Sequence, residues 1–397
     1  MKSAVATTYE LDDAPETARQ LASGIRDKLR LQKYGVGLLL CDADTDGAVV
    51  TLELKKLLGI EILGMTTLAA LDGNGRQEAA AVLTVLTADD CIFSPALSAS
   101  LTGTDPDAII GAAYRASIPA GTSADRQAGL ILVFCPYGMS FSGDAYPAAL
   151  SRVADNVPII GGVASDDYDC ERARVFFSGQ EHKDAMVLLS LWGKARPVFS
   201  IRHVTSRFTE RIGRITDAQG NIVRKVGDES FVSYLESFGL KTDVPDPLLA
   251  FTCFPMMLTT GEGDEGTPLM RHISGLNLAE GSGSFFGDVP VGALANICLI
   301  KKEDIVAACR ESMQSLFAEA ARHPDYVFST ILCFSCCGRA MILGVAAGAE
   351  GEILSKLLQP GLSLAGAYCL GEICPTGYKD GRALNRFHNC SITLCMV

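Results

Sequence analysis

Two apolar segments of this chain are similar to each other although they lie 200 residues apart. Residues 131–138 are ILVFCPYG, and residues 331–338 are ILCFSCCG. Each segment follows an expected helix and precedes another, and the second helix leads to a further apolar segment, PIIGG in one case and LAGAY in the other. This order of elements is typical of repeated α/β units. We therefore predict a mixed α/β fold of two related halves, a pseudo-duplication in which helices flank the sheets of each half.

The division between the two halves is expected near residues 215–230. The segment GRITDAQGNIVRKV has the turn residues of a β-hairpin at 217–221, and a predicted helix over 229–238 follows it. A length of 397 residues also favours more than one domain. We predict one domain over residues 1–214 and a second over residues 215–397.

Composition limits the classes of function. A formal net charge of −12 argues against nucleic-acid binding, because phosphate contacts need clustered Lys and Arg. The opening MKSAVATTYELDD lacks an apolar signal-peptide segment, and no apolar run reaches the roughly 18–20 residues that span a bilayer. We expect a cytoplasmic protein without membrane insertion. Its 14 cysteines are then expected to be reduced thiols, most of them packed in the core.

Polar residues gather at the ends of apolar segments between residues 329 and 393. Three spacings carry them: C-x2-R with Cys336, Gly338 and Arg339, G-x-Y-x2-G-E-x2-P with Tyr368, Gly371 and Glu372, and F-H-N-x3-T with Asn389. Open α/β sheets commonly hold their ligands at strand ends. We therefore expect a binding site in this part of the chain.

Arg339 and Glu372 are the charged members of these spacings. A guanidinium group holds a carboxylate through two parallel hydrogen bonds, and a glutamate accepts hydrogen bonds from an ammonium group. Together the two side chains suit a zwitterion such as an amino acid. The alternative is structural: they pair with each other or cap the strand ends.

The three spacings, with Glu350 between the first two, resemble the C-terminal half of the FIST family (F-box and intracellular signal transduction). The segments DAQGNIVRKVGDESFVSYLESFGL and GSGSFFGDVPVG precede them in the order of the family, and LLLCDAD, ILGMTT and VPIIGGVASDD resemble its N-terminal half. The resemblance implies a soluble sensory module for signal transduction that binds a small ligand, an amino acid or a similar carboxylate metabolite. Its output would pass to a separate signalling protein acting in trans.

The resemblance also implies where the ligand is held. Arg339 would bind the carboxylate and Glu372 the amine, and the first half would close the pocket. The complete set of expected ligand contacts is Arg339, Glu372, Cys336, Gly338, Gly371, Tyr368, Asn389, Gly161, Gly162 and Asp166. Neither a metal ion nor a cofactor is expected.

Two other classes of function stay open at this point. An enzyme would use Cys336 as a nucleophile with Arg339 as the holder of an anion, and His388 within hydrogen-bond reach of Cys336 would favour it. A sensor of another kind would bind haem and nitric oxide through a histidine such as His388 or His203, or would respond to thiol oxidation in the cysteine-rich C-terminal segment.

Overall fold

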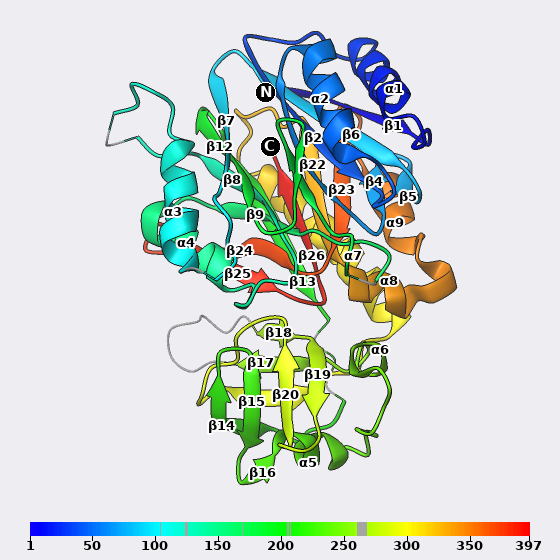
Figure 1. The fold of residues 1–397 in the computed structure, drawn as a ribbon, viewed down its shortest axis with the longest axis vertical. Coiled ribbons are helices and arrows are strands. Elements are labelled where there is room, and N and C mark those ends of the chain that lie inside the picture. Colours follow the sequence, from blue (N-terminus) through cyan, green and yellow to red (C-terminus); the bar gives the residue numbers. More distant parts are fainter. Residues whose placement is uncertain (104, 124–125, 169, 205, 207, 260–267) are drawn as a thin grey trace.

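The computed structural model has a larger α/β lobe and a smaller β lobe (Figure 1). It describes residues 1–103, 105–123, 126–168, 170–204, 206, 208–259 and 268–397. The larger lobe consists of helices and of strands that pair in both parallel and antiparallel directions. This composition confirms the mixed α/β class. Across these described ranges, no helix combines the length and the apolar character needed to span a bilayer.

The larger lobe repeats one order of elements three times: strand, helix, strand, helix, strand, hairpin, strand. The first unit consists of β1 (Lys2–Thr8), α1 (Ala14–Arg26), β2 (Tyr34–Cys41), α2 (Gly47–Leu58), β3 (Glu61–Thr66), β4 (Ala70–Asp72), β5 (Gly75–Gln77) and β6 (Ala81–Ala88). The second consists of β7 (Cys91–Leu97), α3 (Pro106–Ala116), β8 (Leu130–Cys135), α4 (Ala145–Val153), β9 (Ile159–Val163), β10 (Val175–Phe177), β11 (Gln180–His182) and β12 (Val187–Gly193).

The third unit differs in that the smaller lobe is inserted after its first strand and its second helix is divided. It consists of β13 (Val198–His203), α7 (Lys302–Ala320), β22 (Thr330–Cys336), α8 (Cys337–Leu343), η1 (Gly344–Ala346), α9 (Ala349–Leu357), β23 (Ser363–Cys369), β24 (Glu372–Lys379), β25 (Arg382–His388) and β26 (Ser391–Met396).

Acidic N-caps start the first three helices. Asp13, Asp46 and Asp105 each accept a backbone N–H of the first helical turn, at the start of α1, α2 and α3 respectively. Such a cap satisfies a donor that has no partner within the helix and contributes about 1 kcal/mol. The helices therefore begin where the sequence supplies an aspartate before an amphipathic segment.

The central strands β2, β8 and β22 occupy the same position in their sheets. Each is parallel to the next strand of its unit, β3, β9 or β23, and antiparallel to the last strand, β6, β12 or β26. All three are largely apolar, as expected for strands covered on both faces. The similar segments at 131–138 and 331–338 thus have equivalent places in the topology, and β2 is a third equivalent strand that the sequence pattern did not predict. Duplication of the sequence itself stays a prediction.

Each unit completes its sheet with the hairpin of another unit. The hairpin β4–β5 of the first unit pairs with β23, the hairpin β10–β11 of the second pairs with β3, and β24–β25 of the third pairs with β9. The three sheets are thereby linked in a closed ring. Strand pairing crosses residue 214, and the expected domain division at that residue stays a prediction.

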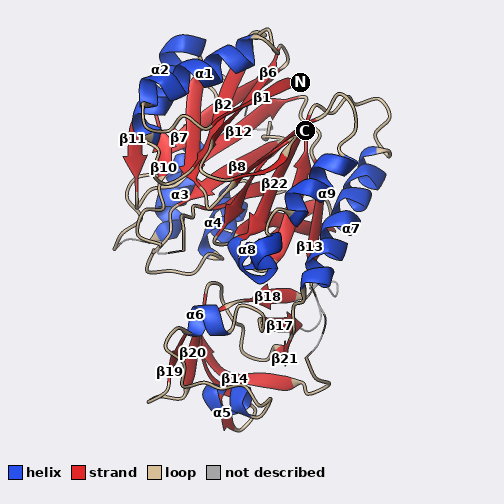
Figure 2. Ribbon diagram, turned by 90° about the vertical axis from the view of Figure 1, so that its right-hand side faces the viewer, coloured by secondary structure: helices blue, strands red, loops and turns tan. Residues whose placement is uncertain are grey.

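The inner faces of the three sheets share one apolar core. Leu38 of β2, Leu132 of β8 and Phe334 of β22 belong to it, and the ring centroids of Phe134 and Phe334 lie 6.4 Å apart. The helices cover the outer faces, α1 and α2 on the first sheet, α3 and α4 on the second, and α7 and α9 on the third (Figure 2). Because burial of one large apolar side chain contributes about 1.5–3 kcal/mol, this shared core holds the units together.

The smaller lobe is an antiparallel β structure with its own apolar core. The predicted hairpin is present, but its turn is shorter than expected: residues 217–219 belong to the first strand, and the turn lies at residues 220–221. The lobe consists of β14 (Gly213–Gln219), β15 (Ile222–Val226), β16 (Glu229–Ser230), α5 (Phe231–Glu236), α6 (Pro247–Ala250), β17 (Met256–Thr259), β18 (Leu269–Arg271), β19 (Ile273–Asn277), β20 (Ser282–Phe285) and β21 (Leu294–Ile297).

Arg271, at the end of β18, ties the smaller lobe to the larger one. Its Nη2 donates to both carboxylate oxygens of Asp144, at 3.0 and 2.9 Å, and its Nη1 donates to the carbonyl oxygen of Phe387 at 3.0 Å. Its Nε donates within its own lobe, to the carbonyl oxygen of Asp288. The arginine is 1% exposed, so its charge depends on these contacts.

We expect Arg271→Met to destabilise the protein by about 3–5 kcal/mol, because it leaves the mostly buried Asp144 without its cation. The measurement is urea unfolding followed by circular dichroism. Arg211→Met is the control, since Arg211 forms a more exposed ion pair with Glu229 within the smaller lobe. An Arg271 variant that unfolds at the same urea concentration as the Arg211 variant would contradict this role.

Candidate functional site

A small cavity of about 30 Å³ lies at the carboxyl end of β22, where the two lobes meet. Because a cavity needs about 10–15 Å³ of such volume to hold a water molecule, this one has room for about two. Three of the predicted site residues line it: Cys336, Gly338 and Asn389. The remaining lining residues are Tyr168, Cys170, Leu248, His272, Phe286, Cys337, Met341 and Leu370.

The larger lobe positions Cys336 and Asn389 through neighbouring strands. Cys336 is the last residue of β22, and Asn389 lies in the turn between β25 and β26. Ser335 of β22 pairs with Ile392 of β26, so the turn lies beside the end of β22. In this turn Cys390 has a φ of 56°, a left-handed conformation that residues other than glycine seldom adopt. Such a conformation persists only where the surrounding structure holds it.

The smaller lobe contributes His272 and Phe286 to the cavity. His272 lies between β18 and β19, Phe286 follows β20, and their ring centroids are 6.0 Å apart. Burial lowers the pKa of His272 to about 4, so its ring is neutral near pH 7. Sequence reasoning did not single out this histidine, although its place beside Arg271 in the apolar segment LMRHISG was an available signal.

Cys336 lies near Cys390 and Gly338. The thiol of Cys390 and the backbone of both residues, with a smaller contribution from the charge of Arg339, lower the pKa of Cys336 against the opposing effect of burial. The pKa of Cys390 is raised, because its proton is held by the sulfur of Cys336.

Glu372 is fully buried at the start of β24. Its Oε2 accepts the hydroxyl of Ser391 at 2.6 Å and the backbone N–H of the same residue at 3.3 Å. Burial and the nearby negative charge of Cys336 raise its pKa. Glu372 pairs across the sheet with Gly162 of β9 and with His388 of β25, so it lies beside the predicted Gly161–Gly162 segment.

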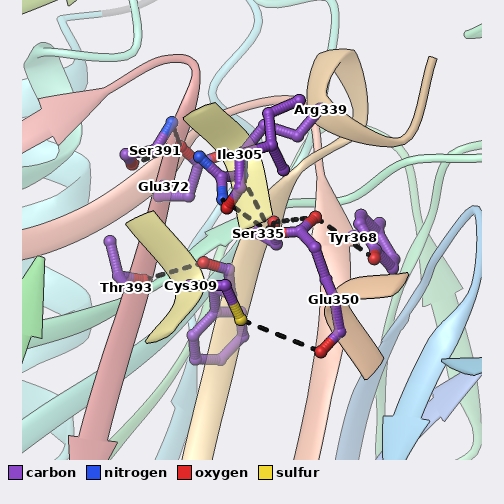
Figure 3. A network of polar contacts seen from close by, with 10 residues as sticks. Ile305, Cys309, Ser335, Arg339, Glu350, Tyr368, Glu372, Ser391 and Thr393 are labelled. Atoms are coloured by element: carbon purple, nitrogen blue, oxygen red, sulfur yellow. Dashed lines mark hydrogen bonds and ion pairs between the residues drawn. The ribbon is translucent and has the colours of Figure 1, made fainter. Parts of the chain in front are cut away.

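Arg339 and Tyr368 converge on Glu350 (Figure 3). Nε and Nη2 of Arg339 donate to Oε1 of Glu350 at 3.0 and 2.7 Å, and the hydroxyl of Tyr368 donates to Oε2 at 3.3 Å. The hydroxyl of Ser335 also donates to Oε2, at 3.2 Å. Arg339, Glu350 and Tyr368 are fully buried. The partner of Arg339 is thus Glu350. The sequence pattern includes Glu350 between the first two spacings but assigns it no role.

The remaining predicted residues have structural contacts. A Cβ on Gly161 would lie 1.9 Å from the carbonyl oxygen of Val133, and one on Gly371 would lie 2.2 Å from the ring of Phe387. A Cβ on Gly162 would approach the sulfur of Cys369 to 2.5 Å. Backbone and side chains therefore pack too closely at these three positions for any other residue.

Asp166 organises the loop after β9. Its carboxylate accepts the backbone N–H groups of Cys170 and Arg172, at 3.0 and 2.9 Å. Tyr168 and Cys170, which line the cavity, both have positive φ angles of 80° and 61°. The aspartate thus positions the loop that closes one side of the cavity.

Among the described residues, His388 forms no hydrogen bond with Cys336. Its Nε2 lies 3.0 Å from the carbonyl oxygen of Cys374, to which it donates, and its ring centroid lies 5.1 Å from that of His203. The cavity beside His272 has no room for a haem, since sites for such molecules measure several hundred Å³ (about 300–1,000 Å³). Among the described residues, no group of three or more His, Cys, Asp or Glu side chains is arranged to hold a metal ion.

Several buried polar atoms at this end of β22 have no hydrogen-bond partner among the described residues. They are Nδ2 of Asn389, both ring nitrogens of His272, Oε1 of Glu372 and Nη1 of Arg339. A buried polar group without a partner costs about 1–3 kcal/mol. Among the described residues, seven further buried polar atoms without a partner belong to other side chains, such as Thr45, Thr84 and Asn296.

A larger cavity of about 190 Å³ adjoins the small one. Phe286 and Leu370 line both cavities, so these two side chains separate them. The ring centroid of Phe286 lies 6.5 Å from that of Tyr137 in the larger cavity. That cavity is rich in aromatic side chains and also borders Gly138, at the carboxyl end of β8.

Comparison with known proteins identifies two family domains in this chain. Residues 35–229 match the FIST N domain, and residues 231–375 match the FIST C domain. Among curated proteins none matches the chain. One solved structure, "T. maritima PurL complexed with ATP", is 9% identical over 100% of this chain and 70% of that chain, with a TM-score of 0.19 that is too low to support an argument.

We expect Arg339→Met to destabilise the protein by about 3–5 kcal/mol, because it leaves the carboxylate of Glu350 buried without a cation. Urea unfolding measures the change. Arg322→Met is the control: Arg322 pairs with Glu319 on the exposed surface of the last turn of α7, and its loss should leave the unfolding midpoint unchanged. Equal midpoints for the two variants would show that the buried pair is not needed.

The neutral state of His272 predicts a pH dependence of stability. Its pKa is about 4 when folded and about 6.5 when unfolded, so the unfolded chain binds the extra proton as the pH falls below 6.5. At pH 5 this histidine should cost about 2 kcal/mol of stability relative to pH 7.5. His272→Gln should therefore lose less stability between these two pH values than the unmodified protein, as measured by urea unfolding at each. The same loss in both proteins would refute the assignment.

Proposed function

Since the chain belongs to the FIST family, a family of signalling sensor domains, we propose that it is a sensory module that binds a small ligand between its two lobes. The ligand is an amino acid or a similar carboxylate metabolite. The set of buried, unpaired polar atoms around the cavity at the end of β22 carries this proposal. The set includes both donors and acceptors, which suits a molecule that has both.

The proposed contacts follow from the atoms without partners. Nδ2 of Asn389 is a donor that lines the cavity and suits a carboxylate oxygen. The neutral ring of His272 offers one donor and one acceptor. Nη1 of Arg339 and Oε1 of Glu372 also have no partner among the described residues, and they offer a donor to a carboxylate and an acceptor to an ammonium group once the site opens.

Ligand binding requires the site to open, because the present cavity has room for only about two water molecules. Rotation of Phe286 would join it to the cavity of about 190 Å³. Phe286 and His272 both belong to the smaller lobe, so a ligand that displaces them also moves this lobe against the larger one. A ligand shifts such an equilibrium by its difference in affinity for the two arrangements. The moved lobe then passes the signal to a separate protein in trans.

The enzyme alternative has one feature in its favour, the lowered pKa of Cys336. A nucleophilic cysteine also needs a general base in reach. His388, the residue that would have filled that role, donates to the carbonyl oxygen of Cys374. We therefore favour the sensor.

A screen of the twenty natural amino acids by thermal shift tests the proposal. Ligands that bind only the folded state raise Tm, so at least one amino acid should do so. Asn389→Asp keeps the shape of the side chain and replaces its donor by a carboxylate oxygen, which repels an acid. With a hydrogen bond to a charged group contributing about 1.5–3 kcal/mol, affinity for the active amino acid should fall by about ten-fold or more.

Asn74→Asp is the matched control for this substitution. Asn74 is exposed in the turn between β4 and β5 and does not line either cavity of the site. This variant should bind the active amino acid as the unmodified protein does. The proposal fails if none of the twenty raises Tm, or if the Asn389 and Asn74 variants bind equally well in calorimetric titrations.

A further inference from the structure

The cavity of about 190 Å³ lies at the carboxyl end of β8, the strand equivalent to β22. Aromatic rings from both lobes form its walls: they come from the loop after β8, from α4 and β25, and from the end of β20 in the smaller lobe. These rings belong to Tyr137, Phe141, Tyr146, Phe285, Phe286 and Phe387. An engineered cavity of about 150 Å³ binds benzene, so this one has room for an aromatic ring with a substituent.

The aromatic rings around this cavity do not form a closed core. The ring centroids of Tyr137 and Phe286 lie 6.5 Å apart, and those of Phe141 and Tyr146 lie 5.3 Å apart. Both separations are typical of aromatic pairs, so the rings support one another. Nevertheless, Tyr137, Phe141 and Phe286 all remain partly exposed. A space with aromatic walls that solvent can reach is suited to take up a further ring.

One wall of the cavity is fixed, and another can turn. A Cβ on Gly143 would lie 2.4 Å from the ring of Phe387, and one on Gly371 would lie 2.2 Å from it. The backbone at both glycines therefore packs closely against this ring and holds it in place. Phe286 is anchored through its backbone, because the N–H of Gly143 donates to its carbonyl oxygen at 3.2 Å. Rotation of its side chain leaves this bond between the lobes intact.

Polar side chains lie among the rings. Ser142 of the larger lobe and Asn221 and Ser274 of the smaller lobe line the same cavity. Nδ2 of Asn221 donates to the carbonyl oxygen of Phe285 at 2.6 Å, and the hydroxyl of Ser274 donates to that of Ser284 at 3.0 Å. A hydroxyl such as that of Ser142 can both donate a hydrogen bond and accept one. The cavity therefore suits a ring that carries a polar group rather than a purely apolar side chain.

We propose that the ligand of this module is an aromatic amino acid with a polar ring, tyrosine or tryptophan, whose ring binds in the cavity of about 190 Å³. This inference rests on the proposed function, in which the charged groups of the ligand bind at the small cavity beside Asn389 and His272. Phe286 and Leu370 line both cavities, so one molecule can occupy the two once Phe286 turns aside. The ring then contacts the aromatic walls, and its hydroxyl or N–H group reaches the polar side chains among them.

The first experiment titrates the full-length protein with each of the twenty amino acids by calorimetry. Tyrosine or tryptophan should bind about ten-fold more tightly than leucine or phenylalanine, because a ring among aromatic walls and a hydrogen bond to its polar group both add to affinity. A non-aromatic amino acid, or phenylalanine, that binds as tightly as the better of the two overturns this inference and leaves the proposed function standing. If none of the twenty binds, the proposed function and this inference fail together.

The second experiment fills the cavity. Ser142→Leu places a larger side chain beside the rings, and it should weaken binding of the preferred aromatic amino acid by about ten-fold or more. Ser142 is only partly buried, so the fold should tolerate the change, and Tm of the ligand-free variant checks this. Ser140→Leu is the matched control, because Ser140 is exposed in the same loop and does not line the cavity. Equal affinities for the two variants would place the ring elsewhere and overturn the inference.

Discussion

The buried carboxylate of Glu350 is the interaction on which the end of β22 depends. It lies in the first turn of α9 and receives hydrogen bonds from Ser335 of β22, Arg339 of α8 and Tyr368 of β23. A charge without solvent costs several kcal/mol unless it is paired. Separation of these segments would therefore leave the carboxylate of Glu350 buried without its partners. Cys336 lies between two of the contacting residues in the chain, so the same contacts fix its sulfur at the edge of the cavity.

The inserted lobe explains why the candidate site lies in the third unit. Cys41, Cys135 and Cys336 end the three equivalent strands β2, β8 and β22. Burial raises the pKa of Cys41 and Cys135. At Cys336 the smaller lobe provides His272 and the β25–β26 turn provides Asn389, so the last residue of this strand itself lines a cavity.

The sequence predicts the fold class well because apolar strands and capped helices are local signals. The equivalence of β8 and β22 follows from their similar residues, whereas the third copy, β2, has a different apolar sequence and is recognisable only from its pairing. Residues near one another in the chain, such as Cys336 and Gly338, could also be predicted to lie together. The pairing of Arg339 with Glu350 could not be predicted, because a guanidinium group that suits a ligand carboxylate suits Glu350 equally well. His272 was missed because it reaches the cavity from the smaller lobe, a placement that depends on tertiary packing.

The exchange of hairpins has a consequence for synthesis of the chain. The hairpin β4–β5 is made early, yet β23, the strand that it pairs with, begins only at Ser363. The edge of β9 likewise waits for β24, which begins at Glu372. Until β23 and β24 leave the ribosome, both strand edges remain uncovered, and uncovered edges invite pairing with other chains. Nascent chains should therefore depend on chaperones until these two strands have been made, because only then can the ring close.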